Sequence, residues 1–450
     1  MNETISEIGA RIRAGDVSPV DLVQSCLTRI ADRSDLNAFI TVLEDSALSE
    51  AEAAAAEISR GQYRGPLHGI PISIKDLVDV AGVPTTSGSA VPPLHPTRDA
   101  PVVQRLREAG AIIIGKTNLH EFAFGTTSDE SAFGPVRHPF DPSRSAGGSS
   151  GGAAVALVEG MCYGSVGTDT GGSIRIPAAA CGIVGLKPAF GELPCEGVVP
   201  LSTTCDHVGP MTRSVEDARL MFQVLRGTRV NDAPVPSSLT LGIPTGYLLE
   251  RLEPEIRSAF ERLQAALTSR GHVLVDVTIG LARSTPDVYL HIVLPEAAAY
   301  HARFLAQHAD RYSPNVRNRL ETGRYMLAED YVRAMQLRER LTRDVSGTLA
   351  ACDALLLPTL PIAAPPLGVQ SVDVDGRPEP VRAAMLRLTQ LFNLTGHPSI
   401  SLPAGVTTSG LPIGAQLVGP AGDTDRLLAI AAALEPQITA GPGSVGGGTG

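Results

Sequence analysis

The sequence contains no tryptophan, and aromatic residues make up only 4% of its 450 residues. Proteins that bind single-stranded nucleic acid stack the bases on aromatic side chains, so this scarcity disfavours such a function. The 37 lysines and arginines are outnumbered by 47 acidic residues and form no basic stripe, and the formal net charge is −10. Because nucleic acids and anionic membranes attract clustered positive charge, we expect neither as a partner.

Long hydrophobic runs are also missing. No stretch approaches the ~20 apolar residues that span a membrane, and the first residues, MNETISEIGARIRAG, show no basic segment followed by an apolar one. We therefore expect a cytoplasmic protein. Hydrophobic residues at 43% and charged residues at 19% are typical of a globular chain with a large core.

Patterns that bind metals or phosphates are absent as well. The six cysteines form no CxxC pair and the ten histidines form no HExxH, so no zinc site or disulfide framework is indicated. We expect mostly buried, free thiols. The phosphate-binding patterns GxxxxGK[ST] and GxGxxG are missing too, although glycine-rich runs are present.

Hydrophobic periodicity predicts alternating helices and strands, and hence a mixed α/β fold. Helical patterns cover 18–33, 47–61, 101–110, 214–227, 254–270 and 423–436, and a mostly helical insert covers about 285–350. Strand patterns cover 70–75, 111–115, 239–243, 272–278, 353–358, 398–403 and 412–419. We expect one domain over residues 1–440, followed by a flexible glycine-rich tail at 441–450.

Lys75 ends an alternating strand pattern, in which Ile70, Ile72 and Ile74 share one face and Lys75 belongs to the other. A lysine at a strand end is usually solvated and charged. If it were buried, its pKa would fall from the ordinary ~10.4 and it could accept a proton. Both interpretations remain open at this point.

Two glycine-rich runs carry serines, SAGGSSGGAAVA at 145–156 and GTDTGGSIRIPAAACG at 167–182. Glycines of this kind serve in turns and close helix contacts. The two glycines before Ser173 also allow successive backbone N–H groups to converge on an oxyanion. No histidine lies near either run, so a nucleophilic serine here needs another base, and Lys75 is the candidate.

These motifs together resemble those of the amidase signature family of serine hydrolases. The resemblance is carried, in family order over nearly the whole chain, by GIPISIKD, AGGSSGG, GTDTGGSIRIPAAACGIVGLKP, FNLTGHPSISLPAG and GLPIGAQLVG. The intervals also agree, with 74 residues from Lys75 to Ser149 and 24 from Ser149 to Ser173. The resemblance implies a single large mixed β-sheet sandwiched by helices, with the helical insert on the substrate side.

The resemblance also implies a role for each catalytic residue. Ser173 would attack the carbonyl, Ser149, on a cis peptide, would relay the proton, and Lys75 would be the terminal base. Thr170, Gly171, Gly172 and Ser173 would form the oxyanion hole with their backbone N–H groups. The supporting residues would be Ser150, Asp169 and Arg175. The substrate contacts would be the carbonyl of Ala123 and the side chains of Phe122 and Phe124.

The expected activity is hydrolysis of the carbon–nitrogen bond in small, mostly uncharged amides or related carbamates, anilides or ureas. It would proceed through an acyl-enzyme, without metal or organic cofactor, in a monomer or homodimer, and esters would be a side activity. The alternative is the glutaminase component of a tRNA-dependent amidotransferase, which needs partner subunits. That component holds glutamine with an arginine and an aspartate; Arg338 stands at the first position, but Leu386 stands at the second.

Overall fold

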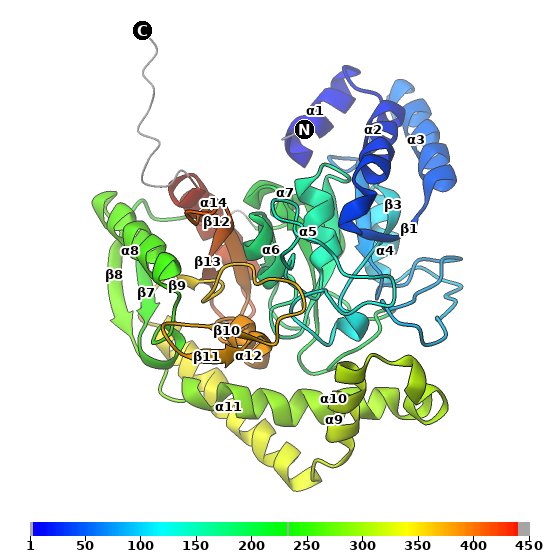
Figure 1. Ribbon diagram of the computed structural model, residues 1–450. Coiled ribbons are helices and arrows are strands. Elements are labelled where there is room, and N and C mark those ends of the chain that lie inside the picture. Colours follow the sequence, from blue (N-terminus) through cyan, green and yellow to red (C-terminus); the bar gives the residue numbers. More distant parts are fainter. Residues whose placement is uncertain (1–2, 232–233, 440–450) are drawn as a thin grey trace.

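The computed structural model describes residues 3–231 and 234–439, and a large mixed β-sheet runs through its centre (Figure 1). Within these residues the sheet has 11 strands in the order β1-β3-β2-β4-β6-β5-β12-β13-β9-β7-β8. They are β1 (Phe39–Val42), β2 (Pro71–Lys75), β3 (Ile112–Thr117), β4 (Gly164–Asp169), β5 (Val184–Lys187), β6 (His207–Thr212), β7 (Thr240–Pro244), β8 (Val273–Val277), β9 (Ala354–Pro358), β12 (Ser399–Val406) and β13 (Pro412–Val418). A separate two-stranded ribbon pairs β10 (Ser371–Asp373) with β11 (Pro378–Pro380).

Helices surround this sheet, and most of them follow the segments with helical periodicity. They are α1 (Ile5–Ala14), α2 (Pro19–Asp32), α3 (Glu44–Ser59), α4 (Pro101–Glu108), α5 (Gly151–Val158), α6 (Arg175–Cys181), α7 (Val215–Arg226), α8 (Pro254–Ser269), α9 (Thr285–His308), α10 (Pro314–Arg324), α11 (Ala328–Leu349), α12 (Val381–Leu386), α13 (Gln390–Leu394) and α14 (Thr424–Thr439). Ser18 begins α2 as expected, because its side chain accepts a hydrogen bond from the N–H of Val20.

Both faces of the sheet are buried, as β9 shows. Ala354 and Leu356 belong to one hydrophobic cluster, while Leu355 and Leu357 belong to a second. Successive side chains of a strand point to opposite faces, so the two clusters lie on opposite sides of the sheet. The expected sandwich of a mixed sheet between helices is therefore confirmed.

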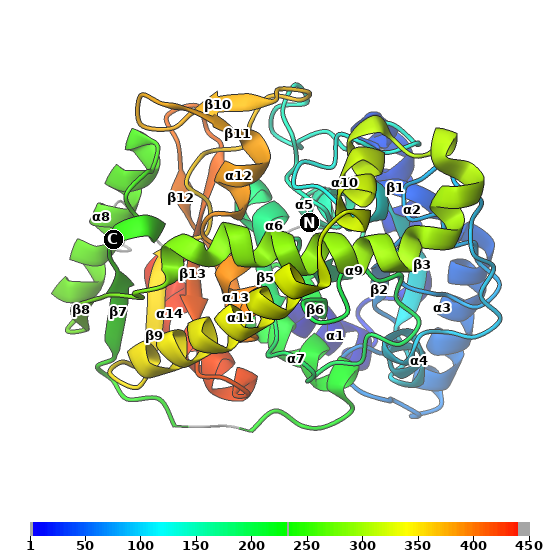
Figure 2. The same cartoon turned by 90° about the horizontal axis from the view of Figure 1, so that it is seen from below.

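The helical insert forms a layer of its own. The insert lies below the sheet in Figure 1, and in Figure 2, seen from below, α9 and α11 cross in front of the sheet with α10 beside the far end of α9. This layer spans residues 285–349, close to the expected limits of the insert. Its apolar residues, including Tyr289 and Leu341, belong to the same cluster as α6 and α12. The insert is thus packed against the segment that carries Ser173.

One strand expectation needs correction. The alternation before Lys75 suggested two unlike faces, but β2 is buried at all five positions. It pairs in parallel with β3 on one side and β4 on the other, so it is an interior strand. Four strands of the sheet were not predicted. The segments β4 (GSVGTD), β5 (VGLK) and β6 (HVGPMT) contain glycine and show no clear apolar alternation, and β1 (FITV) is only four residues long.

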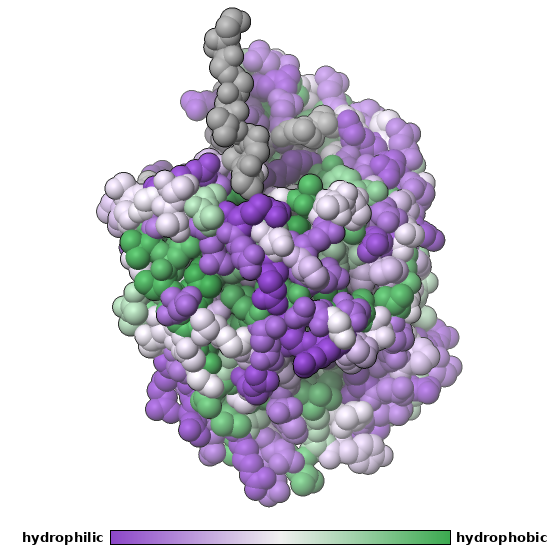
Figure 3. Space-filling model, turned by 60° about the vertical axis from the view of Figure 1, so that its left-hand side comes forward, coloured by the Kyte–Doolittle hydropathy of each residue, from purple (hydrophilic) through white to green (hydrophobic). Residues whose placement is uncertain are grey.

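The surface mixes polar and apolar residues. Figure 3 brings the α8 and β8 side of the molecule forward, where hydrophobic residues (green) lie among hydrophilic ones (purple). β8 is the edge strand there, and Val273 on it is 51% exposed. Four of the six cysteines are buried, Cys352 is partly exposed and Cys195 is exposed. All six are free thiols, so none forms a disulfide. In the described part of the chain, no helix has the length and apolar character needed to cross a membrane. The expected glycine-rich tail lies outside the described residues.

Candidate active site

Lys75 stands at the carboxyl end of β2, inside the protein. Its side chain is fully buried. The Nζ atom donates hydrogen bonds to Ser149 Oγ at 2.7 Å and to Thr168 Oγ1 at 2.8 Å. Neither of these acceptors is a carboxylate, so neither holds the lysine in its charged form. The structure therefore joins two of the three residues selected from the sequence.

Burial lowers the pKa of Lys75 from its ordinary range to about 7, and the negative charges of Asp169 and Asp206 only partly oppose this shift. A lysine with such a pKa is substantially neutral at neutral pH. It can then accept the proton of a hydroxyl group. The solvated, charged interpretation of Lys75 does not apply.

Ser149 is held by its backbone on a tight turn before α5. The Gly148–Ser149 peptide is cis. The Ser149 carbonyl accepts hydrogen bonds from the N–H of His120 at 3.2 Å and from Ser128 Oγ at 3.1 Å. Gly148 packs so closely that an added Cβ would lie 2.7 Å from the backbone nitrogen of Thr127. Glycine is therefore required at 148 by close backbone contact.

Ser173 lies between the end of β4 and the start of α6, and it is almost fully buried. Its carbonyl accepts a hydrogen bond from the Ser150 N–H at 3.2 Å. Ser150 Oγ in turn donates to the Thr168 carbonyl at 3.3 Å. Ser150 thus joins the Ser149 turn to the Ser173 loop.

The backbone from Thr170 to Ser173 presents unused donors. Within the described residues, none of these four N–H groups donates to a protein acceptor. The loop is fixed by other contacts: Thr170 Oγ1 donates to Asp206 Oδ1 at 2.6 Å, and the Gly171 carbonyl accepts from Thr389 Oγ1. Free N–H groups on a fixed loop are what an oxyanion hole needs.

Asp169 and Arg175 flank the loop of residues 170–173 and form an ion pair that holds its two ends together. Arg175 donates from Nε to Asp169 Oδ2 at 3.1 Å and from Nη2 to Oδ1 at 2.9 Å, and both side chains are fully buried. The Arg175 charge holds the pKa of Asp169 well below its usual range, against the opposing effect of burial. Asn393 and Gln416 accept further guanidinium hydrogen bonds with their side-chain oxygens.

Sequence reasoning did not assign Asn393 and Gln416 a role, although both stand in the motifs FNLTG and GAQLVG. It also missed Thr168 and Asp206, which contact Lys75 and Thr170. Thr168 stands in the same run as Ser173. Nothing in the local sequence marks Asp206, because it reaches the site through the fold.

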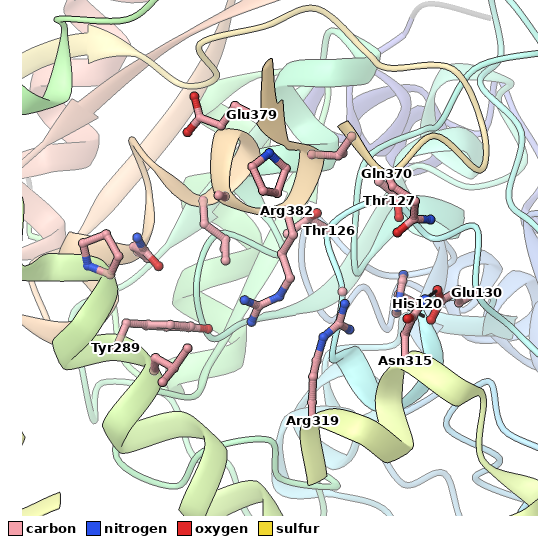
Figure 4. A pocket seen from close by; sticks show the side chains of 18 of the residues that line it. His120, Thr126, Thr127, Glu130, Tyr289, Asn315, Arg319, Gln370, Glu379 and Arg382 are labelled. Atoms are coloured by element: carbon pink, nitrogen blue, oxygen red, sulfur yellow. Dashed lines mark hydrogen bonds and ion pairs between the residues drawn. The ribbon is translucent and has the colours of Figure 1, made fainter. Parts of the chain in front are cut away.

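A cavity of about 550 Å³ opens beside the loop of residues 170–173. Figure 4 shows Tyr289 of α9, Arg319 of α10 and Arg382 of α12 extending into it, with Thr126 and Thr127 on another wall. An added Cβ on Gly171 would lie 2.5 Å from the Tyr289 hydroxyl. The cavity wall is therefore in contact with the Ser173 loop.

Three predicted substrate contacts do not line this cavity within the described part of the chain. Phe122 packs instead against His301 and Tyr312, with ring centroids 4.4 and 5.3 Å apart. Phe124 is buried, and Ala123 is almost so. The backbone turns at Phe122 and Ala123, whose φ angles are 49° and 57°. The lining therefore comes from the next residues, Gly125, Thr126 and Thr127.

Comparison with known proteins agrees with this geometry. The family model described as Amidase matches residues 21–428. The chain belongs to the amidase signature family. It is also 39% identical to an amidase of Pseudomonas putida, over 91% of this chain and 90% of that protein. A solved structure described as an amidase covers 97% of this chain and 100% of its own, at 41% identity and a TM-score of 0.94.

The same family includes a glutamyl-tRNA(Gln) amidotransferase subunit of Chloroflexus aurantiacus, which is 36% identical over 96% of both chains. As a family member, the present chain is an amidohydrolase. In the described part of the chain, no group of three or more histidine, cysteine or acidic side chains has the arrangement of a metal site.

Proposed function

We propose that this amidohydrolase works by acyl transfer through Ser173, Ser149 and Lys75. The observation that carries the proposal is the hydrogen bond of 2.7 Å from a fully buried Lys75 to Ser149 Oγ. With a pKa lowered to about 7, this lysine can take up the relayed proton. No histidine is needed as base.

In the first step, Ser173 Oγ attacks the amide carbonyl and passes its proton to Ser149, whose own proton moves to Lys75. The N–H groups of residues 170–173 stabilise the oxyanion. The tetrahedral intermediate then expels the amine, which receives the proton from Lys75 through Ser149. Water repeats the sequence on the acyl-enzyme and releases the acid and free Ser173.

The substrates that we propose are small amides, anilides, carbamates and ureas, with esters as a side activity. All carry a carbonyl next to a leaving group, so all can form the same acyl-enzyme. The cavity volume of about 550 Å³ suits a small organic molecule. Neither a metal nor an organic cofactor is part of this scheme.

The glutaminase function remains the alternative, and the likeness to the Chloroflexus amidotransferase protein favours it. Two observations count against it. Leu386 lines the cavity at the position expected for a glutamine-binding aspartate. Arg338 donates to the carbonyls of Leu394 and Thr204, which engages it within the protein. We therefore favour an enzyme that acts alone on other amides.

The test is a substrate panel with the purified chain alone: anilides, carbamates, ureas, esters and glutamine. We expect turnover of an anilide without partner subunits, and Ser173→Ala should reduce kcat at least about a thousandfold. Efficient hydrolysis of glutamine, with poor rates on every other class, would support the alternative. Full anilide activity in Ser173→Ala would exclude the proposed mechanism.

A further inference from the structure

Arg382 is a cation without a charged partner among the residues that the structure describes. It lies on α12, and its guanidinium extends into the cavity (Figure 4). Among the same residues it makes no hydrogen bond or ion pair, and its Nε atom is buried without an acceptor. Its aromatic contact is with Phe124, whose ring centroid lies 6.0 Å away. A partly buried charge without a counter-ion is unfavourable, so this residue indicates a ligand that supplies negative charge.

A second arginine lies beside it. Arg319 comes from α10, stacks 5.7 Å from the same Phe124 ring, and donates from Nη1 to the Phe124 carbonyl. Burial and the charge of Arg382 lower the pKa of Arg319 to about 10. The two guanidinium groups therefore repel each other, and Figure 4 shows them extending toward the same space. An anion between them would relieve that repulsion.

Acidic residues on the cavity wall do not neutralise Arg382. Glu379 is paired with Arg387 and with Arg251, whose Nη1 lies 3.2 Å away. Glu130 accepts a hydrogen bond from Asn315, and Asp129 accepts one from Thr127 Oγ1. Both carboxylates act electrostatically on Arg319. For Arg382, burial lowers the pKa and the opposing influence comes from Tyr289, a phenol rather than a carboxylate. The position of Arg382 is therefore open to an anionic ligand.

Arg382 is close to the proposed reaction centre. Leu386 lies four residues beyond Arg382 on α12, so the two share one face of the helix. An added Cβ on Gly171 would lie 2.9 Å from Leu386 Cδ2. Arg382 is thus attached one helical turn along α12 from the residue that lies against the Gly171 loop. A small molecule can reach both.

We propose that the substrate carries a carboxylate, held by Arg382 with Arg319 beside it, while its scissile amide lies against the Gly171 loop. This inference rests on the proposed function and narrows its substrate class. The planar fork of a guanidinium matches a carboxylate with two parallel hydrogen bonds. An uncharged substrate was expected because few charges stand near the motifs; Arg319 and Arg382 come from distant segments and are brought in by the fold.

Kinetics on matched substrates test the proposal. One pair is glutaric acid mono-4-nitroanilide and pentanoic acid 4-nitroanilide, with the carboxylate on the acyl side. The other is 4-acetamidobenzoate and acetanilide, with the carboxylate on the amine side. In at least one pair, we expect kcat/KM to be about tenfold or more higher for the acid. Arg382→Met should lower kcat/KM for the acid about tenfold more than for its neutral twin, and Arg382→Lys should have an intermediate effect.

The control variant is Arg333→Met, on the exposed side of α11, where the arginine side chain is 66% exposed; it should change neither rate. Equal rates for acid and neutral twin in both pairs would overturn the inference. So would an equal loss on both substrates in Arg382→Met. Neutral anilide turnover that Ser173→Ala abolishes would still uphold the proposed function, so the two failures are distinguishable.

A binding measurement decides the case in which none of these compounds is hydrolysed. Glutarate should raise the melting temperature of the Ser173→Ala protein, and glutaramide, its neutral diamide, should raise it less. The shift should disappear in Ser173→Ala/Arg382→Met. That variant loses an unpaired buried charge, so we expect it to fold at least as stably. A glutarate shift that persists without Arg382, or none at all, would overturn the inference.

Discussion

Lys75 and Thr168 stand side by side on neighbouring parallel strands, and Thr168 Oγ1 accepts a hydrogen bond from Lys75 Nζ at 2.8 Å. The threonine hydroxyl accepts this hydrogen bond without adding charge. The other acceptor, Ser149 Oγ, is an uncharged hydroxyl as well. A carboxylate in its place would raise the pKa of Lys75 and keep it protonated. Both direct hydrogen-bond acceptors of Lys75 Nζ are therefore uncharged hydroxyl groups, and Asp169, at the end of β4, acts on the lysine only through its charge.

The first prediction concerns pH. The pKa of Lys75 is about 7, and in the proposed mechanism its neutral form is the base, so kcat/KM for acetanilide should rise with pH through about 7 and then level off. Asp206→Asn should move this rise to lower pH, since Asp206, whose own pKa burial raises to about 7, favours charged Lys75 when it is ionised. The measurement is a pH–rate profile of both proteins. A flat profile from about pH 5.5 to 9 would contradict the role of Lys75.

The second prediction separates catalysis from stability at Lys75. Lys75→Met should lower kcat about a hundredfold or more. In the unfolded chain the lysine binds its proton up to pH ~10.4, but in the folded protein only up to about 7. The unfolded state thus holds more protons between these values, and wild-type stability gains with rising pH there.

Lys75→Met removes this titration, so its free energy of unfolding should exceed that of the wild type more at about pH 7 than at about pH 9.5. Urea denaturation at both pH values is the measurement, with Arg333→Met as the surface control. A Lys75→Met protein that is both unstable and inactive at neutral pH would show that the lysine is structural.

The third prediction concerns the close contact of Gly171 with the insert. In Gly171→Ala the new methyl group would lie 2.5 Å from the Tyr289 hydroxyl, so either the loop of the proposed oxyanion hole or the buried Tyr289 side chain must shift. We expect kcat to fall about tenfold or more. Adding Tyr289→Phe removes the clashing oxygen and should restore part of the rate. Steady-state kinetics of the two single variants and the double variant measure this coupling. Additive losses would exclude it.

The fourth prediction concerns the buried ion pair. Arg175→Met leaves the Asp169 carboxylate buried without its cation, which should lower the free energy of unfolding by ~3–5 kcal/mol. Urea denaturation against Arg333→Met, whose arginine is exposed, provides the comparison. Removing an exposed pair should change stability by less than ~1 kcal/mol. Equal stability of the two variants would mean that Arg175 does not hold this loop.

Much of the fold follows from periodicity. The long helices α2, α8 and α14 and the apolar strands β9 and β13 lie where the sequence predicts them. The glycine-rich centre could not be predicted in the same way. There, small residues remove both the strand and the helix pattern, and β4, β5 and α5 are stabilised by packing rather than by propensity.

The candidate site was likewise predicted only in part. Lys75, Ser149 and Ser173 were selected from motif spacing, and the structure brings the first two into direct contact. Phe122 and Phe124 were selected because large apolar residues suit a pocket. Burial alone does not tell a core residue from a lining one, and both side chains proved to be buried without lining this cavity.

By itself, the sequence determined the family and the proposed catalytic residues: a lysine and two serines at family spacing, glycines where backbones must approach, and no histidine near either glycine-rich run. Those features are local, because each motif carries its own backbone geometry. Only the tertiary structure decided the charge state of Lys75 and the character of the cavity. Both depend on segments far apart in the chain. Burial of Lys75 is set by neighbouring strands, and Arg319 and Arg382 reach one cavity because the fold places α10 and α12 on its walls.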